Sequence, residues 1–211
     1  MKAFYLLVAV LLLTSCSSTR MIDSWKNSNF TNYTPKKVLI IGLTDNLTGR
    51  KLFEERLKKE LTKRGVWAFE SYDVFAPTFT NLKQTEEDIQ KEVQKISQQG
   101  FDAILISAVK GVDEKVATYL GDNFIRDTYW RHFEPYYYIN QDVYFTEGYY
   151  NKYKIYRIEA SLYNIKEHND KSLVWVATFD IVDPKKISST VANYVNAIMR
   201  SLEKEGVITK K

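Results

Sequence analysis

Cysteine, histidine and long apolar segments are scarce in this sequence, and each scarcity excludes a class of protein. The 211 residues contain one cysteine and two histidines. One cysteine cannot form an intramolecular disulfide, and His132 and His168 lack metal-ligand spacing and have no thiol to assist them. We therefore expect neither a disulfide framework nor a metal site. Stability then has to come from a hydrophobic core, which a content of 45% apolar residues can supply.

The N-terminal apolar run is too short to span a membrane. Residues 3–13, AFYLLVAVLLL, form an unbroken apolar stretch behind the positive charge of Lys2. A helix needs about 20 residues to cross a hydrocarbon core of ~30 Å. A run of this length behind a positive charge is typical of the h-region of an export signal. We therefore predict that residues 1–15 are a cleaved signal peptide.

The residues after this run indicate a lipid anchor. Residues 13–16, LTSC, resemble the bacterial lipobox, in which a small residue precedes a cysteine that is diacylated and becomes the new N-terminus. Cys16 is therefore the predicted lipid attachment site and the membrane a predicted partner. The alternative is an ordinary signal peptide with a chance cysteine. The residue after Cys16 is Ser17 and not aspartate. This resembles the pattern that, in enterobacterial sorting, directs a lipoprotein to the outer membrane, where it would face the periplasm.

The charge balance argues against nucleic acid as a partner. The full sequence has a formal net charge of +4, and cleavage before Cys16 removes one positive charge, that of Lys2. A balance this mild does not produce the strong positive field that nucleic-acid binding requires. An exported protein also rarely meets nucleic acid. We expect the partner to be a component of the cell envelope.

The chain after the lipobox predicts a short tether and one domain. Residues 16–35 are polar and rich in serine, asparagine and threonine, as in a tether. Three apolar strands then alternate with two amphipathic helices. The first helix is predicted to begin at the cap Asn46 and the second at the capping box of Thr85. Strands separated by such helices usually pair in parallel. These five elements cover residues 36–43, 47–64, 66–71, 85–99 and 101–109.

An antiparallel hairpin and a C-terminal helix follow in the second half. Residues 153–165 alternate between two faces, and residues 172–182 form the partner strand. Asp183 and Pro184 are the predicted start of the last helix. The predicted fold is α/β (α+β), with a single mixed sheet in one domain that covers residues 36–208.

The second half carries a resemblance to a known family. The string IEASLYNIKEHNDKSLVWVATFDIVDP, followed by an amphipathic helix that ends in LEKEGVI, resembles a family of uncharacterised bacterial lipoproteins. In that family a lipobox precedes a small α/β domain. The resemblance covers roughly residues 36–208, and its fold is similar to the N-terminal domain of the Tol-system β-propeller protein and to lipoproteins that activate cell-wall synthases. Its motifs are structural, so it implies a fold and a compartment rather than a reaction.

The sequence contains no catalytic motif that we recognise. Residues 42–51 lie where a phosphate loop would be, but six residues separate the two glycines instead of four. Asp45 and Asp73 follow predicted strands, at the end where open α/β sheets bind ligands, although a capping or turn role is the simpler interpretation. His168 falls in the hairpin turn. We expect no cofactor, no catalytic residues and no enzyme.

Tyrosine is concentrated between the two halves. Nine of the fifteen tyrosines lie between residues 129 and 156, within a predicted insertion at 119–152. One interpretation is a strand at 140–146 that extends the sheet edge, because tyrosine is a good strand residue. The other, which we favour, is an exposed platform, because tyrosine offers a large contact area with few torsions to freeze. The predicted surface consists of Tyr129, Trp130, His132, Tyr136, Tyr137, Tyr138, Tyr144, Tyr149 and Tyr150.

These features predict a non-enzymatic, lipid-anchored envelope lipoprotein that contacts another envelope component, such as an envelope protein, through the tyrosine-rich surface. An alternative is a lipoprotein that binds peptidoglycan or another cell-wall glycan, because aromatic rings also stack on sugars. A third is an enzyme with a site near Asp45 and Asp73. Binding to isolated cell walls would favour the second, and loss of the biological role in a folded Asp45→Asn variant would favour the third.

Overall fold

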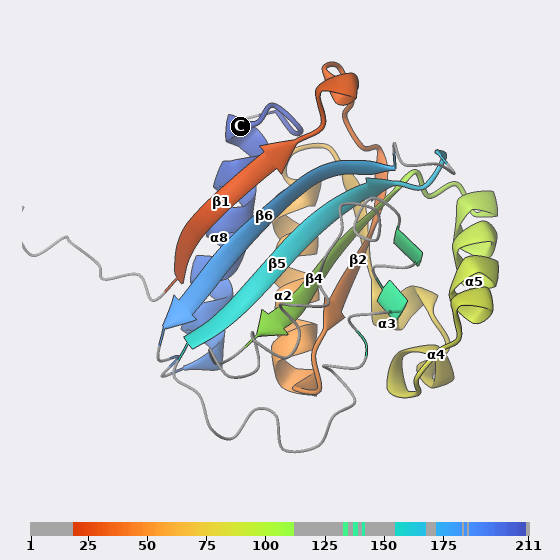
Figure 1. Ribbon diagram of the computed structural model, residues 1–211, viewed down its shortest axis with the longest axis horizontal. Helices are drawn as coiled ribbons and strands as arrows, with labels where there is room; N and C mark the ends of the chain where they lie inside the picture. The colour runs from red at the N-terminus through yellow and green to blue at the C-terminus, as the bar shows by residue number, and fades with distance from the viewer. Residues whose placement is uncertain are drawn as a thin grey trace, which may run out of the picture.

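One six-stranded mixed sheet organises the protein (Figure 1). The computed structural model describes residues 19–111, 133–134, 137–138, 141, 155–167, 172–182, 184 and 186–209. The strand order is β1-β6-β5-β4-β2-β3, in which β2 pairs in parallel with β3 and β4 and the other pairs are antiparallel. The predicted mixed sheet with a C-terminal helix is confirmed. The elements are β1 (Thr19–Lys26), η1 (Ser28–Phe30), β2 (Lys37–Leu43), α2 (Leu47–Thr62), β3 (Trp67–Glu70), α3 (Ser71–Val74), α4 (Pro77–Asn81), α5 (Glu86–Gln98), β4 (Ala103–Gly111), β5 (Ile155–Asn164), β6 (Leu173–Val182) and α8 (Ile187–Lys204).

Local capping signals begin the two helices of the first half. The Asn46 side chain accepts a hydrogen bond from the Gly49 N–H at 2.8 Å and caps α2. Thr85 and Asp88 form the predicted capping box of α5, with three acidic residues in its first turn, where the helix dipole favours them. These bonds satisfy N–H groups that have no partner within the helix. The predicted β-α-β-α-β arrangement therefore follows from signals that are local in the sequence.

The helices cover the sheet on both faces and divide the core in two. The buried residues of α2 and α8 pack with Val38 and Ile40 of β2 on one face. The buried residues of α5 pack with Leu39 and Ile41 on the other face. Because α2 follows β2 on one face and α5 leads into β4 on the other, the neighbouring strands β2 and β4 form a topological switch point. Open α/β sheets bind ligands at such a point, outside the carboxyl ends of the strands.

The tether expected over residues 16–35 is wrong for residues 19–26, which form the edge strand β1. Thr19 lies opposite Ile181 of β6, and the pairing continues to Lys26. Contacts with the end of α8 add to it: the Ser24 hydroxyl donates to Glu205 Oε1 at 3.0 Å, and Lys26 Nζ donates to the Glu205 carbonyl at 3.0 Å. An edge strand is stabilised by backbone pairing with its neighbour. The polar composition of residues 19–26 therefore gave no sign that they form a strand.

The last helix begins later than the sequence predicts. α8 begins at Ile187, after an extended Lys186 that makes no side-chain capping bond, and Pro184 lies exposed before it. The helix covers the fully buried Trp175 of β6, whose Nε1 donates to the hydroxyl of Ser201 at 3.2 Å. The late start leaves Pro184 and Ile187 at the sheet end that also carries the carboxyl end of β6.

Candidate functional site

An apolar cleft of about 510 Å³ opens at the carboxyl ends of β2 and β4. β2 and β4 are neighbouring strands, and α2 after β2 and α5 before β4 cover opposite faces of the sheet. The volume falls in the range of about 300–1,000 Å³ that is typical of small-molecule sites. The lining residues are Gly42, Leu43, Thr44, Asp45, Asn46, Gly49, Arg50, Phe53, Ser107, Val109, Tyr156, Ile158, Ile181, Pro184, Ile187, Thr190, Val191 and Tyr194.

One wall of the cleft is apolar and aromatic. β5 and β6 contribute Ile158 and Ile181, and α8 contributes Val191 and Tyr194. The Tyr194 ring is buried and stacks on Phe53 of α2, with the ring centroids 5.6 Å apart. Its hydroxyl lies 2.8 Å from the hydroxyl of Ser107, and burial raises the pKa of the Tyr194 phenol. Tyr194 therefore stays neutral at physiological pH, and this wall carries no charge.

The opposite wall is polar, but the protein itself uses much of its hydrogen-bonding capacity. Asn46 caps α2, and the Thr44 hydroxyl accepts a hydrogen bond from the Asn46 N–H at 3.2 Å. Arg50 donates to Glu54 and to the hydroxyl of Ser71. Asp45 is exposed at the rim, and partial burial raises its pKa. The wall therefore offers one exposed carboxyl and few other polar groups to a ligand.

A buried carboxylate, that of Glu54, lies behind this polar wall and is hydrogen-bonded to it. Glu54 is fully buried and accepts hydrogen bonds from the Gly42 N–H at 2.9 Å and from the Ser71 N–H at 2.8 Å. Arg50 Nε lies 3.1 Å from Glu54 Oε1. Burial raises the pKa of Glu54, while Arg50, Gly42 and Ser71 oppose the shift. The cluster ties the carboxyl end of β2, the first turns of α2 and the end of β3 into one rigid corner.

The two aspartates singled out in the sequence have different surroundings. Asp45 lines the cleft. Asp73 is exposed in the first turn of α3, after β3, and is not among the lining residues of the cleft. The sequence thus locates one side of the cleft through Asp45. It gives no sign of the apolar wall, because those residues come from β5, β6 and α8.

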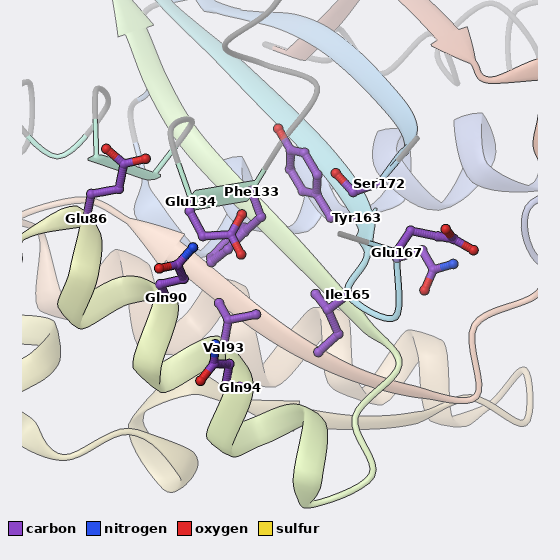
Figure 2. Close-up of a pocket in the computed structure, with 11 residues that line it drawn as sticks. Glu86, Gln90, Val93, Gln94, Phe133, Glu134, Tyr163, Ile165, Glu167 and Ser172 are labelled. Atoms are coloured by element: carbon purple, nitrogen blue, oxygen red, sulfur yellow. The ribbon is translucent and has the colours of Figure 1, made fainter. Parts of the chain in front are cut away.

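A second, smaller pocket of about 210 Å³ lies between α5 and the β5–β6 end of the sheet (Figure 2). Figure 2 shows Glu86 and Gln90 on α5 at one side and Glu167 and Ser172 at the other. Carboxylates and amides of this kind hydrogen-bond to hydroxyl groups and repel anions. The aromatic residues here, Phe133 and Tyr163, are both buried.

The structure divides the predicted tyrosine-rich surface. Tyr137 is only 4% exposed and packs against Phe79 and Phe133, with ring centroids 5.9 and 5.8 Å apart. It belongs to the core beside α5 and cannot be part of an exposed platform. Tyr138 is 41% exposed, as expected for at least one of the three adjacent tyrosines. The remaining members, Tyr129, Trp130, His132, Tyr136, Tyr144, Tyr149 and Tyr150, lie outside the described residues, as do Cys16 and His168.

The strand considered for residues 140–146 does not fit its one described residue. Gln141 is helical and 1% exposed. Its side-chain amide donates to the Gln84 carbonyl at 2.8 Å and accepts from the Gln84 N–H at 2.9 Å. This pair of bonds fixes Gln141 beside the start of α5. Part of the tyrosine-rich segment is therefore packed against the domain.

We expect replacement of Tyr137 by serine to destabilise the domain strongly and replacement of Tyr138 by serine to destabilise it little. Truncating a buried aromatic side chain costs about 3–5 kcal/mol, whereas an exposed one costs about 0.5 kcal/mol or less. For a domain of this size the Tyr137→Ser midpoint should fall by about 6–20 °C and the Tyr138→Ser midpoint by about 2 °C or less. Thermal unfolding followed by circular dichroism measures both. Equal midpoints would show that Tyr137 does not pack in the core.

No protein-family model matches the sequence, and a search of curated proteins found no relative. Two crystal structures of the PelC dodecamer from Paraburkholderia phytofirmans are similar, at TM-scores of 0.43 and 0.42 and 11% identity. Each covers 87% of this chain and 95% of the PelC chain. The lipoprotein GNA1162 from Neisseria meningitidis matches at a TM-score of 0.41 and 13% identity, over 81% of this chain and 99% of that one. Similarity at this level carries no conclusion about function.

Two features are absent from the part of the chain that the structure describes. No helix there is long and apolar enough to cross a membrane. Within the same residues, no group of three or more histidine, cysteine, aspartate or glutamate side chains is arranged to hold a metal ion.

Proposed function

We propose that this protein is a non-enzymatic, lipid-anchored lipoprotein of the cell envelope that holds one α/β domain close to the membrane and binds another envelope component there. The observation that carries the proposal is the position of β1. The folded domain begins at Thr19, three residues after Cys16. Three residues span at most about 11 Å. A lipid on Cys16 would therefore keep the domain at the outer-membrane surface, facing the periplasm.

Strand register defines which end of the domain faces the anchor. Thr19 pairs with Ile181 near the end of β6, and Ile155 at the start of β5 pairs with Val182. Gly111 at the end of β4 pairs with Arg157 at this same end. Figure 1 shows the start of β1 and the ends of β6 and β4 at this side of the sheet. β4 therefore ends, and β5 begins, at the anchor end of the sheet.

The chemistry of the described surface favours binding over catalysis. The cleft is lined by a neutral tyrosine, a capping asparagine and an arginine that is hydrogen-bonded to buried groups. A nucleophile activated by a neighbouring base, the usual arrangement of covalent catalysis, is not found among these lining residues. Glycan binding is the second candidate, and the pocket of Figure 2 favours it, because carboxylates and amides there match the hydroxyl groups of sugars.

Photo-crosslinking in living cells tests the proposed function. A photoreactive amino acid at Tyr138, which is 41% exposed, reports on the tyrosine-rich surface. Lys91 on α5 has a side chain that is 66% exposed and serves as the control position. We expect a discrete protein adduct from Tyr138 and none from Lys91. Adducts with cell-wall material alone would favour glycan binding, and identical adducts at both positions would contradict a specific contact surface.

A further inference from the structure

We infer that the apolar cleft takes an acyl chain of a membrane phospholipid, so that the domain docks end-on onto the membrane in which Cys16 is anchored. The inference rests on the proposed anchoring and adds a ligand class and an orientation to it. Four observations carry it: the place of the cleft, the chemistry of its lining, the residues around its mouth and the shortness of the chain between the cleft and the anchor.

The cleft lies at the anchor end of the sheet. Ile181 lines it and is the strand partner of Thr19. Directly paired residues in adjacent antiparallel strands are about 5 Å apart. Cys16 is at most about 11 Å of chain further on. An anchored domain therefore cannot move its cleft far from the lipid surface, and lipid is the most concentrated apolar ligand near it.

The lining suits an acyl chain better than a polar ligand. Ten of its eighteen residues are apolar or aromatic. Of the polar ones, Ser107 pairs with Tyr194, and Arg50 is held by Glu54 and Ser71. A polar ligand would lose its hydration in the cleft, and these groups could not replace it because they are already hydrogen-bonded within the protein. An acyl chain needs no hydrogen bonds, and its binding becomes more favourable in proportion to the apolar area that is removed from water.

One exposed apolar side chain lies at the edge of the cleft. Ile187, which lines the cleft, is 43% exposed. Lys186 precedes Ile187 and is exposed. An apolar side chain beside an exposed cation matches the boundary between acyl chains and anionic headgroups.

A single-cysteine labelling experiment tests the inference. The mature chain from residue 16 with Cys16→Ala has no cysteine, because Cys16 is the only one. An environment-sensitive fluorophore is attached to a new cysteine at Thr190 in the cleft or, as control, at Leu82, which is 59% exposed and is not a lining residue. Vesicles of phosphatidylethanolamine and phosphatidylglycerol carry a nitroxide quencher on the acyl chain or on the headgroup.

We expect vesicles to quench the label at residue 190 more strongly from the acyl-chain nitroxide than from the headgroup nitroxide, and to leave the label at residue 82 unchanged. Without the covalent anchor, binding is reversible and rises with lipid concentration. Ile187→Asp should weaken binding about tenfold or more, because it places a charge where an isoleucine would be buried against lipid. Leu82→Asp is the matched control and should bind as well as the parent. Circular dichroism confirms that each variant folds.

Two results would overturn the inference without touching the proposed function. One is an absence of quenching at residue 190 at any lipid concentration. The other is quenching that Ile187→Asp and Leu82→Asp reduce equally. In either case anchoring through Cys16 and the adduct from Tyr138 would stand or fall on their own experiments, because neither depends on what occupies the cleft.

Discussion

Replacing Cys16 with alanine is expected to move the protein from the membrane fraction to the soluble fraction. Each buried CH₂ of an acyl chain contributes about 0.8 kcal/mol, and two or three chains together give an effectively permanent anchor. No described helix is able to replace that anchor by crossing the membrane. The end-on contact inferred for the cleft is reversible, so repeated washing at low protein and lipid concentration removes it. Fractionation followed by immunoblotting measures the outcome.

The control for this experiment keeps the cysteine. Ser17→Ala leaves Cys16 in place and should remain in the membrane fraction, and mass spectrometry of its N-terminal peptide should detect the acyl chains. The variant that combines Cys16→Ala with Ile187→Asp removes both membrane contacts and should be soluble without washing. If that double variant still sediments with membranes, the protein is held there by something other than a lipid on Cys16.

Replacing Glu54 with alanine is expected to destabilise the fold strongly, although the side chain is charged. Glu54 is fully buried and accepts hydrogen bonds from Gly42, Ser71 and Arg50. Its removal leaves backbone donors without their acceptor and the buried guanidinium of Arg50 without its counter-charge. Breaking a buried ion pair from one side costs about 3–5 kcal/mol. The thermal midpoint should therefore fall by about 6–20 °C.

The neighbouring residue supplies a matched control for Glu54. The Glu55 side chain is 45% exposed and pairs only loosely with Lys51, at 4.0 Å. Exposed pairs of this kind contribute about 0–1 kcal/mol, so Glu55→Ala should leave the midpoint nearly unchanged. Chemical denaturation of both variants gives the two free energies of unfolding. Similar values for Glu54→Ala and Glu55→Ala would show that the buried cluster does not support the corner of the cleft.

Most of the fold follows from patterns that are local in the sequence. Short stretches of the sequence predict the caps at Asn46 and Thr85, the apolar strands of the first half and the strands of the alternating hairpin. The structure contains all of them. β1 was missed because its composition is polar and because its partner residues in β6 lie 149 to 162 positions further on in the chain. An isolated edge strand has no sequence signal of its own, since its neighbour supplies the hydrogen bonds.

The candidate site was harder to predict than the fold. Asp45 marked one rim of the cleft, because residues that follow parallel strands gather at one sheet edge. The apolar wall comes from Tyr156 and Ile158 of β5, Ile181 of β6, and Ile187, Val191 and Tyr194 of α8. In a sequence these positions look like ordinary core positions. Tyr137 and Tyr138 are adjacent in the chain, yet one is buried and the other exposed. Sequence alone could not show which of the two is buried, because Tyr137 is buried through its packing against Phe79 and Phe133.

Residue type, periodicity and capping were enough to predict a compartment, the alternation of strands and helices and the starts of α2 and α5. These signals act over a few neighbouring residues. The folded domain was needed to show that residues 19–26 complete the sheet, that Glu54 is buried in a charged cluster and that an apolar cleft lies beside the start of β1. Those features arise from segments far apart in the chain, and they exist only once the sheet has aligned its strands and brought those segments to one end.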